Sequence, residues 1–411
     1  MARRKARLDG KQRVATLVSF ANIMRFFPEP AVAEVLRKTG KESLRERELP
    51  APMVCLYAIA LCLFTDVSCE EVLRCLIEAR RWISSKARNV EIPSKGAISM
   101  ARTRLGASPL KELYDGIVKP QAELSTKGAF YKSWRMNAID GTVLDLQDSG
   151  VNSRRFGRPS ASRGDSAFPQ LRAVALAECG THVLYGVELS GVRTSEVELA
   201  HKVVRKLRKG DLNMADRNFF GFRMWGEAGE NGADRLWRVK KNLILKALET
   251  MPDGSYLAKI YADQAARRYD RDGVTVRIVE YRIKGMKGGE RIRLMTSILD
   301  HEAAPAEELA ELYHERWEIE SSFDELKTHL LAGETRLRSK TPELVEQEAY
   351  ALLMAHFVIR AVLHEAALKA DVDSDRLSFK HALCVVRRRI KSAPVGAFSP
   401  SANCLASRGN P

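Results

Sequence analysis

One short segment, Tyr313 to Lys327, reads YHERWEIESSFDELK and contains Tyr, Arg, Glu and Lys side chains at spacings that suit one face of a helix. The segment has no Gly or Pro and is rich in Glu, Leu and Lys, which predicts a helix. At about 100° per residue, Tyr313, Arg316, Glu320 and Lys327 share one stripe roughly 60° wide. The helix is therefore expected to present a phenol, a guanidinium, a carboxylate and an ammonium in one row.

A second stripe of this helix, at about 220–280°, is apolar and predicts the edge that packs on the protein core. Its members are Leu312, Ile319, Phe323, Leu326 and Leu330. The helix is expected to cover about 305–330. Taken alone, Glu320 would be one more surface glutamate, and only its position beside a buried edge singles it out.

Two aspartates follow apolar runs of strand length. Asp140 stands in NAIDGT, and Asp216 stands in NMADRNFF. Each has a purely structural alternative. An Asp-Gly pair between apolar residues is a strong hairpin-turn signal, and an Asp just before a helix is a common N-cap. Neither aspartate decides between these alternatives by itself.

The combination of the three carboxylates favours chemistry. If the strands that end near Asp140 and Asp216 are neighbours in one sheet, the packed helix brings Glu320 to the same edge. Three carboxylates this close repel one another unless cations hold them, which predicts a catalytic site with Mg²⁺ or Mn²⁺ bound, as a pair of ions. Two such ions can activate an attacking water or hydroxyl and stabilise the leaving oxygen of a phosphoryl transfer.

The cations on the same stripe then have a function. Arg316 and Lys327, with the Tyr313 phenol, are expected to contact the phosphates that flank a scissile phosphodiester bond. Asp324 lies near the stripe and is either a salt-bridge partner of Lys327 or a substitute metal ligand; Glu320 is preferred because it completes the spacing.

The elements around these residues follow the order of a ribonuclease-H-like sheet: three strands, a helix, a strand, a helix and a strand. Their expected ranges are 136–146, 171–179, 181–191, 195–207, 211–216, 218–228 and 234–241. A β-hairpin over 273–299 predicts a β-rich insertion at about 241–300. The polar loop 147–170, with Arg154, Arg155, Arg158 and Arg163, is expected to order on binding.

Helical regions flank this α/β part. We predict three domains: a helical DNA-binding domain over 1–127, the catalytic domain over 128–340, and a helical region with a disordered tail over 341–411. The helices expected at 51–64, 70–82 and 94–105 end in a basic one and resemble a helix-turn-helix arrangement. A small bundle with an exposed basic face is the competing interpretation.

The charge balance favours a polyanionic partner. The 411 residues include 67 Lys and Arg against 52 Asp and Glu, a net charge of +15, and residues 1–130 contain 23 basic and 14 acidic residues. Nucleic acid is the simplest partner for such an excess, through phosphate neutralisation. A basic protein without such a partner is the alternative.

Cysteine usage and hydropathy indicate a reducing cytoplasm and no membrane partner. The seven cysteines form no pair or Cys/His set with zinc spacing. The first residues, MARRKARLDGKQR, lack the apolar core of a secretory signal. The longest apolar run, Ala51 to Phe64, is too short to span a bilayer.

With these motifs in place, the sequence resembles the DDE transposases of the insertion-sequence-four family. The family pattern Y-x₂-R-x₃-E-x₆-K is unbroken from Tyr313 to Lys327, AIDGT is similar to its first aspartate motif, and DRNF is similar to its second. LRSKTPELVEQEAYALLMAH is similar to the family segment after this pattern. The resemblance covers about 30 to 370.

The resemblance implies that Asp140, Asp216 and Glu320 are the metal-binding catalytic triad of a DNA transposase. Such an enzyme cleaves at the terminal inverted repeats of an insertion sequence, passes through a DNA hairpin, and joins the freed 3′-hydroxyls to target DNA. It implies a homodimer that pairs two DNA ends, and Arg217 as a further DNA contact. A catalytically inactive DNA-binding relative and a ribonuclease-H-like nuclease without strand transfer are the alternatives.

One departure concerns the base that the better-known relatives flip during hairpin formation, which stacks on a Trp of the β insertion. The hairpin strands 274–300 contain no Trp here. Trp237, Tyr269 and Tyr281 are the candidates for that stacking contact.

Overall fold

The computed structural model describes residues 21–387 except 44, 46–48, 66, 84–91, 162, 163, 166, 283–290 and 332–335. The chain forms two compact units. The first comprises 1–121, 144–171 and 323–411, and the second comprises 122–143 and 172–322. The three domains predicted from the sequence stay a prediction, since the compact units cut across them.

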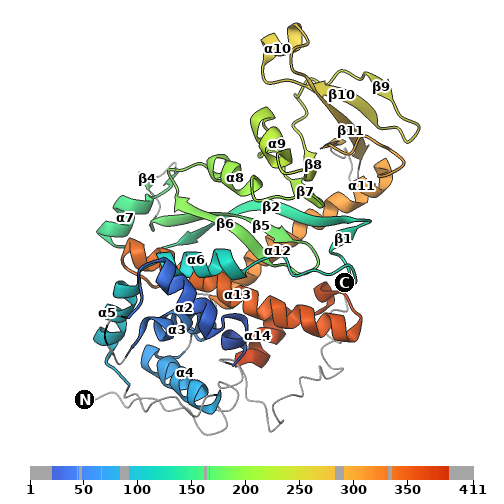
Figure 1. Cartoon of the computed structure of the whole chain (residues 1–411). Coiled ribbons are helices and arrows are strands. Elements are labelled where there is room, and N and C mark those ends of the chain that lie inside the picture. Colours follow the sequence, from blue (N-terminus) through green and yellow to red (C-terminus); the bar gives the residue numbers. More distant parts are fainter. Residues whose placement is uncertain are drawn as a thin grey trace. The chain divides into compact units, whose positions relative to one another are not determined.

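The second unit is built on a mixed sheet (Figure 1). Five strands run in the order β6-β5-β2-β7-β8, which is the third, second, first, fourth and fifth of them along the chain. This is the ribonuclease-H-like order that the sequence predicts. The strands are β2 (Trp134–Asp145), β5 (Gln170–Glu178), β6 (Leu184–Gly191), β7 (Asp211–Ala215) and β8 (Asp234–Arg238).

Parallel pairing of β2 with β7, and of β7 with β8, fixes the middle of the sheet. β7 reads DLNMA and is buried at every position, as expected for a central strand covered on both faces. The predicted helices are α8 (Glu196–Val204), whose cap Ser195 accepts a hydrogen bond from Glu198 N–H, and α9 (Phe222–Gly229). β1 (Phe130–Tyr131) pairs with β2.

The β-rich insertion continues this sheet. β12 (Arg291–Thr296) pairs antiparallel with β8, and β11 (Val274–Arg282), β10 (Tyr256–Ile260) and β9 (Glu249–Thr250) follow. A short helix, α10 (Gln264–Arg268), lies between β10 and β11. The insertion and the central strands share one apolar core, which includes Leu212, Met214, Leu236 and Leu294. The turn of the predicted hairpin lies outside the described residues.

The helix expected over 305–330 is helical throughout but changes geometry three times. α11 (Ala306–Leu312) is followed by a 3₁₀ stretch, η1 (Tyr313–Trp317), then by α12 (Glu318–Asp324) and by a π-helix, η2 (Glu325–Leu330). The assumption of a constant α-helical rotation of 100° per residue was therefore wrong for this segment. Such changes inside a helix are often found at functional sites.

The first unit is helical. Its long helix, α13 (Pro342–Ala370), packs on α3 (Ala51–Leu63), α5 (Lys95–Leu105), α6 (Ser108–Ile117) and α14 (Phe379–Arg387). The unit also contains α2 (Glu29–Lys38), α4 (Cys69–Ile83) and the short helices α7 (Gly150–Phe156) and η3 (Ser374–Arg376). Ser94 is the N-cap of α5, and its hydroxyl accepts from Ala97 N–H at 3.3 Å.

Three details of the first unit differ from the prediction or extend it. α7 lies in the segment expected to be a loop, with Arg163 outside the described residues. In the helical region predicted over 341–411, the described residues contain α13, η3 and α14, and the tail after Ser392 is not described. α2 and α6 were not predicted.

α13 is long and apolar enough to cross a membrane by length and composition. However, 78% of its most apolar window is buried inside the protein, as in a core helix. Within the described residues the cysteines are free thiols, and Cys55, Cys62 and Cys75 are buried in the first unit. Burial raises the pKa of the Cys55 and Cys62 thiols to about 12.

Candidate active site

Two neighbouring parallel strands bring Asp140 and Asp216 to the same level of the sheet. The register pairs Ile139 of β2 with Ala215 of β7, so the two aspartates are the next residues on each strand. Both side chains are half-buried. The adjacency that the sequence argument required is therefore present in the second unit.

The structural alternatives for both aspartates were wrong. Asp140 is not in a hairpin turn, because β2 continues past it to Asp145. Asp216 does not cap α9, because that helix begins at Phe222 and its N-cap is Gly221. Asp216 instead opens a tight turn in which its carbonyl accepts from Phe219 N–H at 3.0 Å.

The 3₁₀ stretch η1 attaches the third element to the sheet. The Tyr313 hydroxyl donates to the carbonyl of Ala215 at 3.1 Å, one residue before Asp216. Tyr313 is buried in the apolar core of the second unit, where it is 6% exposed. Its hydroxyl therefore serves a backbone contact, and its predicted contact with a phosphate stays a prediction.

Arg316 joins two of the three predicted ligands. Its guanidinium donates to Glu320 at 3.0 Å and lies 3.6 Å from the Asp140 carboxylate. The Glu320 side chain is 43% exposed, so it faces outward while the Arg316 side chain is only 9% exposed. The helix thus meets the sheet at Asp140 through Arg316 and at Asp216 through Tyr313.

The electrostatics follow from this crowding. Burial raises the pKa of Asp140 to about 6, and the negative charges of Glu196 and Glu320 add to the rise. The Gly141 N–H, which donates to Asp140 at 2.8 Å, and the charge of Arg316 oppose it. Burial also raises the pKa of the Tyr313 hydroxyl, so this phenol is a neutral hydrogen-bond donor.

Glu196, which the sequence did not single out, is a fourth carboxylate at this edge. It opens α8, and a Cβ added to Gly141 would meet its Oε1 at 2.0 Å. Only glycine leaves room for the carboxylate against the backbone beside Asp140. Burial raises the pKa of Glu196, Arg172 opposes the rise, and the charge of Asp216 adds to it. The sequence signal was the glycine directly after the aspartate.

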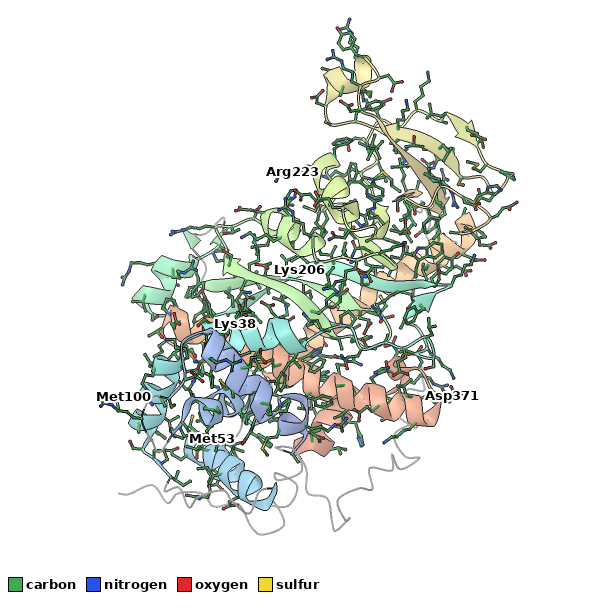
Figure 2. The ribbon with its side chains drawn as sticks, viewed as in Figure 1. Lys38, Met53, Met100, Lys206, Arg223 and Asp371 are labelled. Atoms are coloured by element: carbon green, nitrogen blue, oxygen red, sulfur yellow. The ribbon has the colours of Figure 1, made fainter. Side chains whose placement is uncertain are left out.

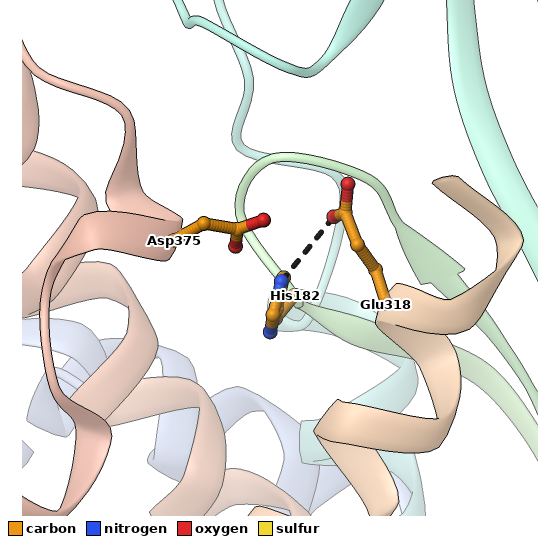
Figure 3. A group of neighbouring side chains, drawn as sticks. All are labelled: His182, Glu318 and Asp375. Carbon is orange, nitrogen blue, oxygen red and sulfur yellow. Dashed lines mark ion pairs between the residues drawn. The ribbon is translucent and has the colours of Figure 1, made fainter. Parts of the chain in front are cut away.

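A second carboxylate on α12 fixes the helix to the β5–β6 turn. Glu318 accepts from Gly180 N–H at 2.5 Å and lies 3.3 Å from His182 Nε2, as Figure 3 shows for the latter pair. Gly180 has a φ of +77° and packs so closely on the backbone of 127–129 that no side chain fits. Glu320 is therefore carried on a helix anchored two residues earlier.

A buried polar network lies three residues before each aspartate. Asn213 Nδ2 donates to Asn137 Oδ1 at 2.7 Å, and Trp237 Nε1 donates to Asn213 Oδ1 at 2.9 Å. All three side chains are fully buried on β2, β7 and β8. Because these bonds form only in one register, they help to fix the level of Asp140 against Asp216.

The candidate stacking aromatics have different environments. Trp237 is fully buried, so in this structure it cannot stack on a base, while Tyr281 is half-buried. Tyr269 is 59% exposed, with the guanidinium of Arg268 at 5.7 Å and that of Arg271 at 4.9 Å from its ring. Trp317, which the sequence argument did not consider, is 58% exposed.

The remaining predicted contacts are exposed. Arg217 follows Asp216 in the turn after β7. Lys327 belongs to the first unit, where η2 is held by Glu325, whose carboxylate accepts from Arg360 at 2.8 Å. Asp324 accepts from Thr328 at 2.6 Å, which differs from the predicted pairing with Lys327. The DNA contacts of Arg217 and Lys327 stay predictions.

The donor set suits a hard divalent cation. Asp140, Asp216 and Glu320 offer only carboxylate oxygens, which Mg²⁺ and Mn²⁺ prefer. Among the described residues, this triad is not a group whose ligand atoms all lie within 4.8 Å of one another. The Arg316 guanidinium contacts two of the carboxylates, those of Asp140 and Glu320, and the Glu320 side chain is 43% exposed.

Comparisons with known proteins identify transposases as relatives of this chain. A model of the transposase DDE domain matches residues 135–358, and one of the insertion element 4 transposase N-terminal region matches 17–115. The transposase InsG for insertion sequence element IS4 of Escherichia coli K12 is 27% identical over 92% of this chain and 85% of its own length. The putative transposase InsZ of the same strain is 24% identical over 54% of this chain and 72% of its own length.

A solved chain is also similar. The piggyBac transposase, in a cryo-EM structure of its synaptic complex with hairpin DNA, matches 90% of this chain and 79% of its own with a TM-score of 0.46 and 12% identity. The DDE-domain match alone spans more than half of the chain and contains Asp140, Asp216 and Glu320. The chain therefore belongs to the DDE transposases of the IS4 family.

Proposed function

We propose that this transposase cleaves DNA at the terminal inverted repeats of an insertion sequence and joins the resulting 3′-hydroxyl ends to target DNA. The observation that supports it most is the register that levels Asp140 with Asp216, together with the Arg316 contacts that connect Glu320 to the same edge. The alternatives, an inactive DNA-binding relative and a nuclease without strand transfer, have no such specific support.

In this proposal the carboxylates of Asp140, Asp216 and Glu320 would hold Mg²⁺ or Mn²⁺, as a pair of ions. Such ions supply activation of the attacking oxygen and stabilisation of the leaving oxygen in an in-line displacement. Other side chains of the protein hold these carboxylates in position. The Asn137–Asn213 bond and the Tyr313 hydroxyl hold the two strand ends, and Glu318 anchors the helix that carries Glu320.

The charge and the solvent exposure of several arginine and lysine side chains support DNA as the substrate. Arg217 and Lys327 are exposed cations near the triad in sequence, and Arg316 has a fork geometry that suits a phosphate. On α5, Lys95 and Arg104 are exposed, whereas Arg102 donates to Gln347 at 2.9 Å within the helical unit. We therefore assign a DNA contact of α5 to its exposed cations. A homodimer would pair the two ends.

Of the three candidate aromatics for the flipped base, Tyr269 is the one that is largely exposed. An exposed aromatic ring between two guanidiniums provides a stacking face and charge for the flanking phosphates. Asp270, in a left-handed conformation, holds the adjoining turn by accepting from Lys259 at 2.9 Å and from Tyr261 at 2.8 Å. The ring is thus presented on an ordered turn.

The experiment is a product analysis. The protein is incubated with Mg²⁺, DNA that carries the flanking terminal repeats, and a target plasmid, and the products are separated on a denaturing gel. We expect nicked ends, hairpin ends and joined product. Cleavage without joined product would support the nuclease, and binding of the ends without any cleavage would support the inactive relative.

A further inference from the structure

Arg316 contacts two of the three carboxylates that are predicted to bind metal, those of Glu320 and Asp140. Its Nη2 donates to Glu320 at 3.0 Å, and its Nη1 lies 3.6 Å from Asp140. The two carboxylates come from different elements, β2 and α12, so the guanidinium is the cation that links them. A planar fork with several donors suits this bridging better than the single ammonium of lysine would.

The guanidinium is held where it is. Two aromatic rings of η1 lie beside it, with their centroids 6.0 Å away for Tyr313 and 5.4 Å away for Trp317. Tyr313 is itself fixed by its bond to Ala215. The Arg316 side chain is only 9% exposed, so its charge lies at the edge of the site and is largely shielded from solvent.

One donor of this guanidinium is unused. Arg316 Nε is buried and has no hydrogen-bond partner. A buried donor of this kind calls for a partner, such as a water, an ion or a ligand. An arginine that engages a phosphate typically uses two donors at once, so the free Nε is a suitable partner for a phosphate oxygen.

We propose that Arg316 is the resident counter-ion of the catalytic carboxylates, and that a divalent cation and this guanidinium compete for Asp140 and Glu320. A DNA phosphate that accepts from Arg316 draws it off the carboxylates, so binding of the DNA end increases the affinity for metal. By linkage, metal increases the affinity for the DNA end by the same factor. This inference rests on the proposed function and adds the order in which the site is assembled.

The sign of the effect follows from charge. Asp140 and Glu320 repel each other, and Glu196 adds a third negative charge at the same edge. Arg316 relieves this repulsion and at the same time repels a dication. Removal of the Arg316 guanidinium leaves the carboxylates without a counter-ion. Their uncompensated negative charge then attracts a dication more strongly than in the wild type.

The test is Mn²⁺ binding to the full chain without DNA, measured by electron paramagnetic resonance. We expect Arg316→Gln to bind Mn²⁺ about 5- to 100-fold more tightly than the wild type, the usual range of such coupling. Arg223→Gln is the matched control (Figure 2), since it removes one arginine of the same unit that is 76% exposed and pairs with Glu227. We expect no change for it.

A second measurement repeats the titration with terminal-repeat DNA. In the wild type the DNA should raise the Mn²⁺ affinity, and in Arg316→Gln this increase should disappear. Equal or weaker Mn²⁺ binding by Arg316→Gln in the absence of DNA would overturn the inference. If that variant does not fold, the absence of any DNA-dependent increase in the wild type would overturn it.

The same titration separates this inference from the proposed function. Asp140→Asn and Glu320→Gln should each weaken Mn²⁺ binding, because each removes a ligand charge. If both variants bind Mn²⁺ as the wild type does, the metal site itself is misplaced and the proposed function fails. If both bind weakly and Arg316→Gln does not bind tightly, only the competition fails.

Discussion

At the residue scale, the position of each carboxylate is set by a neighbour that performs no chemistry. The Tyr313 hydroxyl holds the end of β7 beside Asp216, and Glu318 holds α12 two residues before Glu320. Gly141 leaves the space that Glu196 fills beside Asp140. The site therefore depends on short-range backbone contacts as much as on its carboxylates.

Tyr313→Phe tests the assignment of that hydroxyl. It leaves the carbonyl of Ala215 without its side-chain donor, so we expect a loss of about 1 kcal/mol in the free energy of unfolding and a melting temperature lower by about 2 °C. DNA-end affinity should be unchanged and cleavage slower. A drop in DNA affinity with unchanged thermal stability would instead mean that the phenol contacts a phosphate.

The raised pKa of Asp140 predicts the pH dependence of metal binding. Because this pKa is about 6, the carboxyl is protonated below that pH, and a metal ion must displace the proton. Apparent Mn²⁺ affinity should fall by up to about tenfold per pH unit below pH 6 and change little above pH 7. A titration series from pH 5 to 8 that gives constant affinity would contradict this.

Glu196→Gln tests the fourth carboxylate. It keeps the shape of the side chain and removes a negative charge close to Gly141, so we expect about three- to tenfold weaker Mn²⁺ binding. Glu198→Gln, on the same first turn of α8 but exposed, is the matched control and should bind normally. Equal affinities for the two variants would remove Glu196 from the account.

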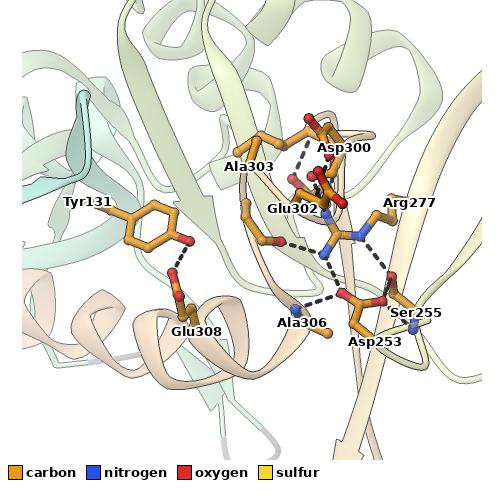
Figure 4. Close-up of polar contacts among 12 residues, drawn as sticks. Tyr131, Asp253, Ser255, Arg277, Asp300, Glu302, Ala303, Ala306 and Glu308 are labelled. Carbon is orange, nitrogen blue, oxygen red and sulfur yellow. Dashed lines mark hydrogen bonds and ion pairs between the residues drawn. The ribbon is translucent and has the colours of Figure 1, made fainter. Parts of the chain in front are cut away.

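At the element scale, the β insertion is tied to the helix that carries Glu320 through one buried arginine. Arg277 on β11 is fully buried and pairs with Asp253, while its guanidinium also donates to carbonyls of the segment that leads into α11 (Figure 4). Those carbonyls belong to Ile298, Asp300 and Ala304. The insertion therefore braces the start of the helical segment.

Arg277→Met should be strongly destabilising. It removes the guanidinium from Asp253, which keeps its bonds from Ser255 and Ala306, and it leaves the three carbonyls without this donor. We expect this loss to lower the free energy of unfolding by about 3–5 kcal/mol. Lys259→Met, which breaks an exposed pair with Asp270, is the control and should leave the denaturation midpoint nearly unchanged. Urea denaturation of both variants measures the difference, and similar midpoints would contradict the bracing role.

The elements show what the sequence can and cannot predict. Strands β2, β5, β6, β7 and β8 follow from runs of apolar residues, and the level of Asp140 with Asp216 follows from their order. The change from α to 3₁₀ geometry at Tyr313 does not, because it depends on packing against β7. For the same reason the sequence could not show that Trp237 is buried against Trp225, 5.3 Å away.

At the scale of the whole molecule, the net charge of +15 and the family membership support the same proposal from independent directions. The helical unit and the sheet unit each contain exposed cations, but only the sheet unit contains the three carboxylates of the triad. DNA binding and catalysis can therefore be separated by mutation. An account in which the triad only stabilises the fold predicts that both are lost together.

The most direct test of the central claim is Mn²⁺-dependent cleavage of terminal-repeat DNA by Glu320→Gln, measured beside its affinity for the same DNA. Glu311→Gln, on an exposed position of α11, is the control. We expect Glu320→Gln to lower the cleavage rate by at least about a thousandfold, to bind the end within about threefold of the wild type when divalent cations are absent, and to melt at the same temperature. Cleavage at the wild-type rate by Glu320→Gln would contradict the assignment of the triad.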